Sequence, residues 1–248
     1  MRYLVLSDIH GNLEAFEAVL AHAADQHYDR TLVLGDLVGY GADPNAIVEA
    51  VIALNPAAVI RGNHDKVAAG VESADGFNAA ARRAVAWTAE ALTPASRAYL
   101  TNLPAGPAFV DSDLEICHGA PGNEDEYLFE AHDAAKALRD SERPMCFFGH
   151  THVPVVYQLS PDNELEVSGL DRASARRLTL QPGCKYLVNP GSVGQPRDGD
   201  ARAAYAMFDT QTHELTLFRV VYPIETAQAK IREAGLPDVL ATRLAAGR

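Results

Sequence analysis

Residues 3 to 12 read Tyr3-Leu4-Val5-Leu6-Ser7-Asp8-Ile9-His10-Gly11-Asn12, and this stretch decides the fold. The first four residues form an apolar, partly β-branched run that is too short for a helix and is typical of a buried strand. Polar residues follow at once, and helical spacing of apolar residues begins at Leu13. A strand, a polar turn and a helix in this order predict the start of a βαβ unit.

The same arrangement recurs four more times along the chain. Apolar runs at 31–34, 58–60, 114–117 and 145–148 are also predicted strands, and polar residues follow each of them. These later clusters are Gly35-Asp36, Gly62-Asn63-His64-Asp65, His118-Gly119 and Gly149-His150-Thr151-His152. Because ligands of open α/β sheets bind outside the carboxyl ends of the strands, all five clusters are expected to converge on one site.

The remaining periodicity indicates an α/β protein. Helical spacing is found at 13–24, 46–54, 78–92, 96–103, 131–139 and 226–234, and further strands are predicted at 155–159, 165–167, 186–189, 203–209 and 214–220. Alternating strands and helices favour a largely parallel sheet in the first two-thirds, and the later hairpin-like strands favour a second, antiparallel-rich sheet. No linker divides the chain, so we expect a single domain over 1–248, with 66–103 as a helical cap insertion.

Composition excludes several classes of function. The 248 residues are 48% hydrophobic and carry a formal net charge of -12, which disfavours binding of nucleic acid or an anionic membrane through a broad basic surface. No apolar run is long enough to span a membrane, and no secretory signal pattern is present, so we expect a cytoplasmic protein. The three cysteines form no CxxC pair, and structural disulfides are not expected.

The residue types in the clusters are those of a metal site. Taken singly, Asp8, Asp36 or Asn63 would be a helix cap or a turn residue, but five of the nine histidines of the chain also fall in these clusters. In extended backbone, residues two apart point to the same side, which would bring Asp8 and His10 together. Imidazole, carboxylate and amide donors without thiolates suit borderline divalent ions such as Mn, Fe, Co, Ni or Zn.

The blocks D-x-H, G-D, G-N-H-D, H-G and G-H-T-H, in this order over residues 8 to 152, resemble the calcineurin-like metallophosphoesterase superfamily. The resemblance implies a four-layer α/β/β/α sandwich of two mixed sheets with the helical cap over the metal centre. It also implies two divalent metal ions as cofactors. One ion would be bound by Asp8, His10, Asp36 and His152, and the other by Asp36, Asn63, His118 and His150.

The same resemblance assigns the reaction and its other residues. A hydroxide that bridges the two ions would attack the phosphorus, and His64 would be the general acid for the leaving group. The adjacent Asp65 is expected to orient the imidazole of His64. Asn12 and Arg197 are candidate contacts for the phosphate, and the substrate is expected to be a small phosphorylated molecule.

One stretch departs from the protein phosphatase branch of the superfamily. The protein phosphatases and symmetrical dinucleoside tetraphosphatases have G-D-x-V-D-R-G where this chain reads Gly35 to Gly41, so Tyr40 replaces their phosphate-binding arginine. The chain is more similar to the small bacterial and archaeal phosphodiesterase-like group, and we predict a phosphodiesterase. The alternatives are a phosphomonoesterase or protein phosphatase, a dinucleoside polyphosphate hydrolase, and a non-catalytic scaffold of the same fold. The acidic charge disfavours a nuclease.

Overall fold

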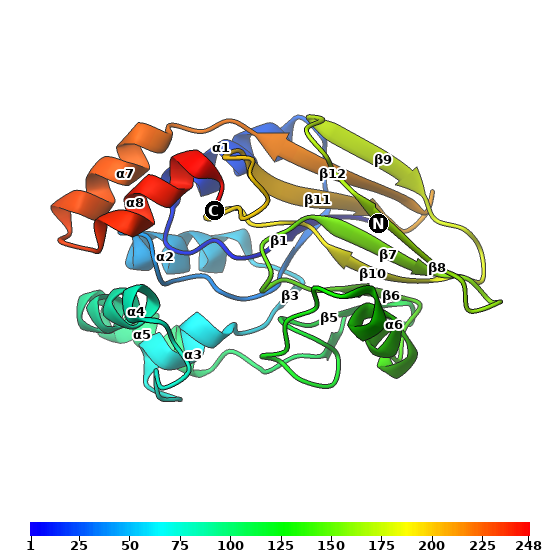
Figure 1. Cartoon of the computed structure of the whole chain (residues 1–248), viewed down its shortest axis with the longest axis horizontal. Helices are drawn as coiled ribbons and strands as arrows, with labels where there is room; N and C mark the ends of the chain where they lie inside the picture. The colour runs from blue at the N-terminus through cyan, green and yellow to red at the C-terminus, as the bar shows by residue number, and fades with distance from the viewer.

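The computed structural model describes residues 1–248, and its centre is a pair of six-stranded sheets packed face to face (Figure 1). The first sheet has the order β3 (Ala58–Val59), β2 (Arg30–Val33), β1 (Arg2–Leu6), β11 (Ala203–Asp209), β12 (Glu214–Val220) and β9 (Ala175–Thr179). The second has the order β4 (Ala108–Phe109), β5 (Leu114–Ile116), β6 (Met145–Phe147), β10 (Lys185–Asn189), β7 (Val155–Leu159) and β8 (Leu165–Gly169).

Both sheets are mixed, as the family resemblance implied. In the first, β1, β2 and β3 are parallel, whereas β11 pairs antiparallel with β1. In the second, β5, β6 and β10 are parallel, whereas β7 pairs antiparallel with β10. The separation into one parallel and one antiparallel sheet, predicted from periodicity alone, is therefore wrong. Periodicity reports which face of a strand is buried, but not which strand lies beside it.

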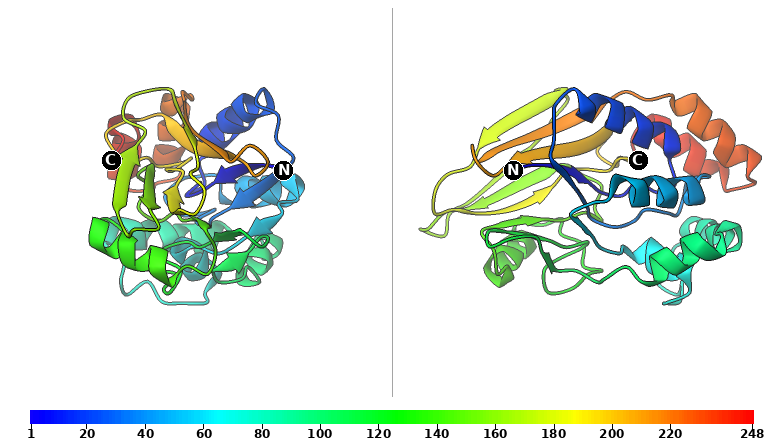
Figure 2. Two further views of the ribbon diagram at one scale, coloured as in Figure 1. Left: turned by 90° about the vertical axis from the view of Figure 1, so that its right-hand side faces the viewer. Right: turned by 180° about the vertical axis from the view of Figure 1, so that it is seen from behind.

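Helices cover the outer face of each sheet and complete four layers (Figure 2). The outer face of the first sheet is covered by α1 (Leu13–Ala24), α2 (Pro44–Leu54), α7 (Ile224–Glu233) and α8 (Asp238–Ala246). The second sheet is covered by α6 (Ala131–Asp140), which packs on β7 and β10. Three buried apolar clusters correspond to the three boundaries between the layers, and the middle one joins the two sheets. No helix in the structure has both the length and the apolar character to cross a membrane.

The segment expected to be a cap contains the end of α3 (Asn63–Ala69), and then α4 (Ala79–Ala91) and α5 (Pro94–Thr101). The helices α4 and α5 pack on α2 and α3, at the lower left of Figure 1, and contribute Val85 and Leu100 to the same buried cluster as α1. A cleft opens beside the polar clusters at the strand ends, and neither α4 nor α5 lines it. The part of this segment that does so is the end of α3 and the loop of residues 72–77 that connects it to α4.

Candidate metal centre

The predicted ligands converge at one end of the sandwich, and both sheets supply them. Asp8 and His10 follow β1 and Asp36 follows β2, whereas His118 follows β5, and His150 and His152 follow β6. Their donor atoms form two groups, each with all of its atoms within 4.8 Å of one another. The first group is Asp8, His10, Asp36 and His152, and the second is Asp36, His118 and His150. Asp36 belongs to both groups, which is the geometry of a ligand shared by two ions.

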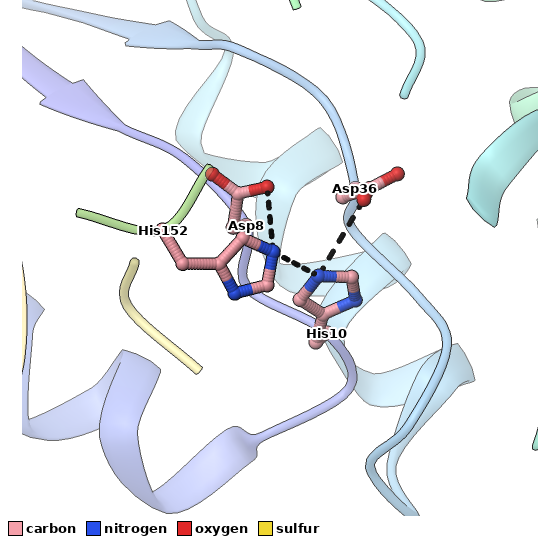
Figure 3. A group of neighbouring side chains, drawn as sticks. All are labelled: Asp8, His10, Asp36 and His152. Atoms are coloured by element: carbon pink, nitrogen blue, oxygen red, sulfur yellow. Dashed lines mark hydrogen bonds and ion pairs between the residues drawn. The ribbon is translucent and has the colours of Figure 1, made fainter. Parts of the chain in front are cut away.

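Figure 3 shows the first group, whose side chains point toward one another. The Nε2 atom of His152 lies 3.3 Å from Oδ1 of Asp8, and Nε2 of His10 lies 3.5 Å from Oδ2 of Asp36. In the second group, Nε2 of His118 is also 3.5 Å from Oδ2 of Asp36. The amide of Asn63 extends this group, since its Oδ1 lies 3.3 Å from Nε2 of His118.

The backbone at these ligands is left-handed rather than extended. Asp8, His10, Asp36, His150 and His152 have φ between 50° and 67°, a region that residues other than glycine rarely occupy. The two-residue spacing therefore brings each pair together through turns and not through the alternation of a strand, which corrects the sequence-based reason for their proximity. Backbone strain of this kind persists only where surrounding contacts enforce it, and it is concentrated at functional sites.

Close approach of two loops is part of the same geometry. At Gly62, a Cβ atom would collide with the carboxylate of Asp36, and at Gly149 it would collide with Ser7. The glycines thus leave room for the shared ligand and its neighbours.

Backbone carbonyls hold three imidazoles in one tautomer. The Nδ1 atom of His10 lies 3.0 Å from the carbonyl of Val38, that of His118 is 2.8 Å from Leu34, and that of His152 is 2.6 Å from Gln195. Because a carbonyl accepts hydrogen bonds only, each Nδ1 must carry a proton, so each Nε2 presents a lone pair to the site whenever its ring is neutral. The Nε2 atoms of His10 and His152 lie 3.2 Å apart. Two facing lone pairs repel unless a cation lies against them.

Burial and charge set the protonation of the ligands. Burial lowers the pKa of His10 and His152 well below the ordinary value and that of His150 to about 3, so these rings are neutral at pH 7. Burial also opposes charge on His118, but the neighbouring carboxylate of Asp36 outweighs it and raises the pKa of His118 to about 10. A divalent cation would take the place of that proton, since metal ligands bind in the deprotonated form.

The residues present fit a pair of divalent ions. Besides the facing lone pairs, Nε2 of His150 is buried without a hydrogen-bond partner. The donors are imidazole, carboxylate and amide, a set that suits borderline ions.

Comparisons with known proteins agree with this geometry. The model of the calcineurin-like phosphoesterase superfamily domain matches residues 1–213. This chain belongs to the calcineurin-like phosphoesterase superfamily. It is 42% identical to a metallophosphoesterase from Sphaerobacter thermophilus. The two structures superpose over 100% of both chains with a TM-score of 0.88. It is 37% identical to an uncharacterized protein of Methanocaldococcus jannaschii over 98% of this chain and 97% of the relative.

A hypothetical protein from Pyrococcus horikoshii shares the fold, with a TM-score of 0.80 over 100% of this chain and 98% of that one, although the identity is 21%. The family match and the Sphaerobacter relative therefore make this chain a metal-dependent phosphoric ester hydrolase of a dinuclear-metal family. Its buried Asp and His residues are positioned to hold the metals.

Within this phosphoesterase, the imidazole of His64 lies at the border of the first ligand group. Its ring centroid is 4.9 Å from that of His10, 4.3 Å from Tyr40 and 4.6 Å from Phe77. Burial lowers the pKa of His64 to about 4, and its Nδ1 atom is buried without a partner. The ring thus retains an unused nitrogen beside the metal ligands.

Asp65 does not contact that imidazole. Its carboxylate accepts hydrogen bonds from the backbone N–H groups of Val38 and Gly62, at 3.1 and 3.0 Å. The expectation that Asp65 orients His64 through its ring is therefore corrected: Asp65 joins the loop after β2 to the start of α3, and so fixes the backbone on which His64 stands. The reason is that Asp65 is the third residue of α3, where a carboxylate reaches back to the cap residue.

Arg197, a candidate phosphate contact, lies against Tyr40 and Gln195. Its guanidinium carbon lies 5.7 Å from the centre of the Tyr40 ring, and its Nη2 donates to Oε1 of Gln195 at 3.1 Å. No carboxylate pairs with it, and its Nε is buried without a partner. Asn12 differs, because its Oδ1 caps α1 and its Nδ2 donates to the carbonyl of Gly194 at 2.8 Å and to the hydroxyl of Tyr222. Its polar atoms are already engaged within the fold.

Several supporting residues were not singled out from the sequence. The Ser7 hydroxyl donates to Asp8 at 2.6 Å, and the Ser192 hydroxyl donates to the Asp8 carbonyl at 2.8 Å. The Asn189 amide donates to the Gly149 carbonyl at 2.7 Å. The loop of residues 189–194 thus braces the turns that carry the predicted ligands.

Proposed function

We propose that this phosphoesterase is a phosphodiesterase that acts on a small phosphorylated molecule. The observation that carries the proposal is the balance of charge around the ligands. The cleft beside the site is lined by Lys66, but the ammonium of Lys66 lies within 3.2 Å of carboxylate oxygens of Glu72, Glu124 and Asp125. Arg197 has no such partner. The unpaired guanidinium of Arg197 offers a cation with two donors to the two free oxygens of a phosphodiester.

The position of Tyr40 supports the same choice. The guanidinium that protein phosphatases and dinucleoside tetraphosphatases carry at this point of the sequence is absent, and Arg197 approaches from another loop and packs against the Tyr40 ring. A guanidinium can donate two hydrogen bonds to the two free oxygens of a diester.

The proposed ligands are those of the two groups, with Asp36 shared and Asn63 added to His118 and His150. Two divalent ions bound there would lower the pKa of a water held between them and neutralise the phosphoryl oxygens. The chain's own contribution is positional. Its carbonyls fix the imidazole tautomers, Arg197 binds the non-bridging oxygens, and His64 delivers a proton to the leaving oxygen. A phosphate anion beside the ring of His64 would favour the protonated form that this step requires.

A metal-by-substrate assay tests the proposal. The purified protein, loaded in turn with Mn, Fe, Co, Ni and Zn, would be offered bis(p-nitrophenyl) phosphate and p-nitrophenyl phosphate. We expect metal-stimulated release of nitrophenolate with a higher kcat/KM for the diester. A higher kcat/KM for the monoester would reject diesterase specificity, and no turnover with any metal would favour the scaffold alternative.

A further inference from the structure

A row of aromatic rings extends from the metal centre to the surface. The ring of Tyr127 stacks on the imidazole of His150, with centroids 3.8 Å apart and planes inclined by 28°. The ring of Phe129 stacks in turn on Tyr127, at 5.5 Å and 7°. Tyr127 is 47% exposed and Phe129 is 60% exposed. The row therefore begins at a predicted metal ligand and ends in solvent.

The row borders the cleft that leads to the ligands. This cleft has a volume of about 250 Å³, and its lining includes Asn63, His150, Phe77 and Tyr127. Phe77 belongs to the loop between α3 and α4, so the cleft has one aromatic residue from each of two separate loops. A group attached to a phosphate at the metal centre would pass between them.

Ion pairs hold the aromatic loop in place. Arg61 donates to both carboxylate oxygens of Glu124, at 3.1 and 2.8 Å, and Lys66 lies 2.7 Å from Oδ2 of Asp125. The side chain of Lys66 is 3% exposed. Two of the three acidic residues that precede Tyr127, Glu124 and Asp125, are thus paired. The loop is preorganised, and its negative charge is compensated where an anionic substrate would enter.

We propose that Tyr127 and Phe129 form a platform that stacks a planar aromatic group carried by the phosphoester, such as a nucleobase or an aryl ring. The platform rests on the proposed function, because it narrows the substrate of the same site. Stacking on aromatic side chains tolerates different bases, since every base presents a π-face.

The test compares ligands that differ in the planar group. Adenosine 5′-monophosphate and ribose 5-phosphate would be titrated into the Mn-loaded protein by calorimetry. We expect the nucleotide to bind about tenfold more tightly. In Phe129→Ala this gap should close through weaker nucleotide binding, with ribose 5-phosphate unchanged. Phe109→Ala is the matched control, because Phe109 is a phenylalanine that is 49% exposed on β4, outside the cleft. Equal affinities in the wild type, or a gap that survives Phe129→Ala, would overturn the platform.

A second pair of ligands separates the two sources of the ring. Phenyl phosphate binding more tightly than methyl phosphate, with the gap again lost in Phe129→Ala, supports a general aryl platform. A difference in affinity seen only between adenosine 5′-monophosphate and ribose 5-phosphate would indicate that the platform accepts nucleoside esters. Release of inorganic phosphate from these monoesters would contradict the proposed diesterase specificity, yet the platform could still be judged from the KM values. Self-association that is lost in Phe129→Ala, without any affinity gap, would make the rings a protein contact and would also overturn the proposal.

Discussion

The predicted metal ligands and the aromatic loop beside them are held in place differently. On the ligand side, Asp36 and the imidazoles are buried, held by backbone carbonyls and placed on strained left-handed turns. On the loop beside it, Tyr127, which stacks on His150, and Phe129 are exposed, and the loop is held by side-chain ion pairs. Backbone contacts cannot be changed by substituting the residue that provides them, whereas ion pairs and exposed rings can. The fold therefore fixes the chemistry at the predicted ligands, whereas the choice of substrate depends on side chains of the aromatic loop that single substitutions can change.

The largest effect should follow from removing the shared ligand. Asp36→Asn weakens the contact to both His10 and His118, and it should abolish metal-dependent turnover and the rise in Tm on adding Mn. We expect a loss beyond the roughly 100-fold typical of residues that only support a ligand. Metal content and thermal unfolding measure it, with the exposed Asp162→Asn as the control. Retention of two equivalents of metal would break the idea of a shared ligand.

His64 should affect turnover without affecting metal binding. His64→Ala removes the proposed proton donor, and we expect kcat to fall by about 10²- to 10⁴-fold on diesters with a poor leaving group. Diesters of p-nitrophenol need little protonation and should lose less. Metal content should match the wild type. Equal losses on good and poor leaving groups would mean that His64 is not the acid.

Arg197 lies near the predicted ligands, but on a loop that carries none of them. Its substitution tests whether phosphate binding depends on a side chain outside the ligand groups. Arg197→Gln should raise KM for a diester by about tenfold, because it removes the cation that binds the free oxygens. Arg197→Lys should recover part of this, since it restores the charge but not the paired donors. Steady-state kinetics measure both variants. A KM that does not change in Arg197→Gln would place the phosphate contact elsewhere.

The smallest effect concerns the ion pairs of the aromatic loop. Burial opposes charge on Glu124, but its hydrogen bond from Arg61 and the charge of Lys66 lower the pKa of its carboxyl below the ordinary value. The pairing therefore stabilises the fold above about pH 4.3, the ordinary pKa of glutamate, and is lost as the pH falls through the lowered value.

Glu124→Gln should lower the free energy of unfolding by about 1–2 kcal/mol near neutrality, and this difference should shrink toward zero in acid. Denaturant unfolding as a function of pH measures it. Glu126→Gln is the control, because the Glu126 carboxylate has no ion pair in the structure. A difference that does not vary with pH would show that charge on Glu124 does not stabilise the loop.

Most of the local structure was predictable from the sequence, because it depends on local periodicity. The helix α1 and the strands β7, β11 and β12 have the predicted bounds. The strand β9 was missed, since Arg176 and Arg177 interrupt the apolar pattern on an exposed edge. The helices α3 and α8 were also missed. The cluster at 62–65 predicts a turn after a strand, which hides the first turn of α3, whereas residues 66–69 lie within the predicted helical insertion.

The candidate site was also predictable only in part. The candidate ligands were predicted from residue types at strand ends and from the family resemblance, and the structure brings their side chains together. The partners of Asp65 and Asn12 did not follow, because a carboxylate or an amide beside a candidate acid or phosphate site can equally bond to backbone from a distant loop. Tyr127 carried no signal in the sequence, since its importance arises from stacking on His150, which is 23 positions away along the chain.

The sequence by itself determined the family, the ligand set and the class of reaction, because these depend on the types and order of residues at strand ends. Only the tertiary structure decided which strands are neighbours in each sheet, that carbonyls such as that of Val38 fix the tautomers, and that Arg197 lies against Tyr40. Such pairings join residues far apart in the chain. They depend on which surfaces pack together, and a local pattern carries no record of that choice.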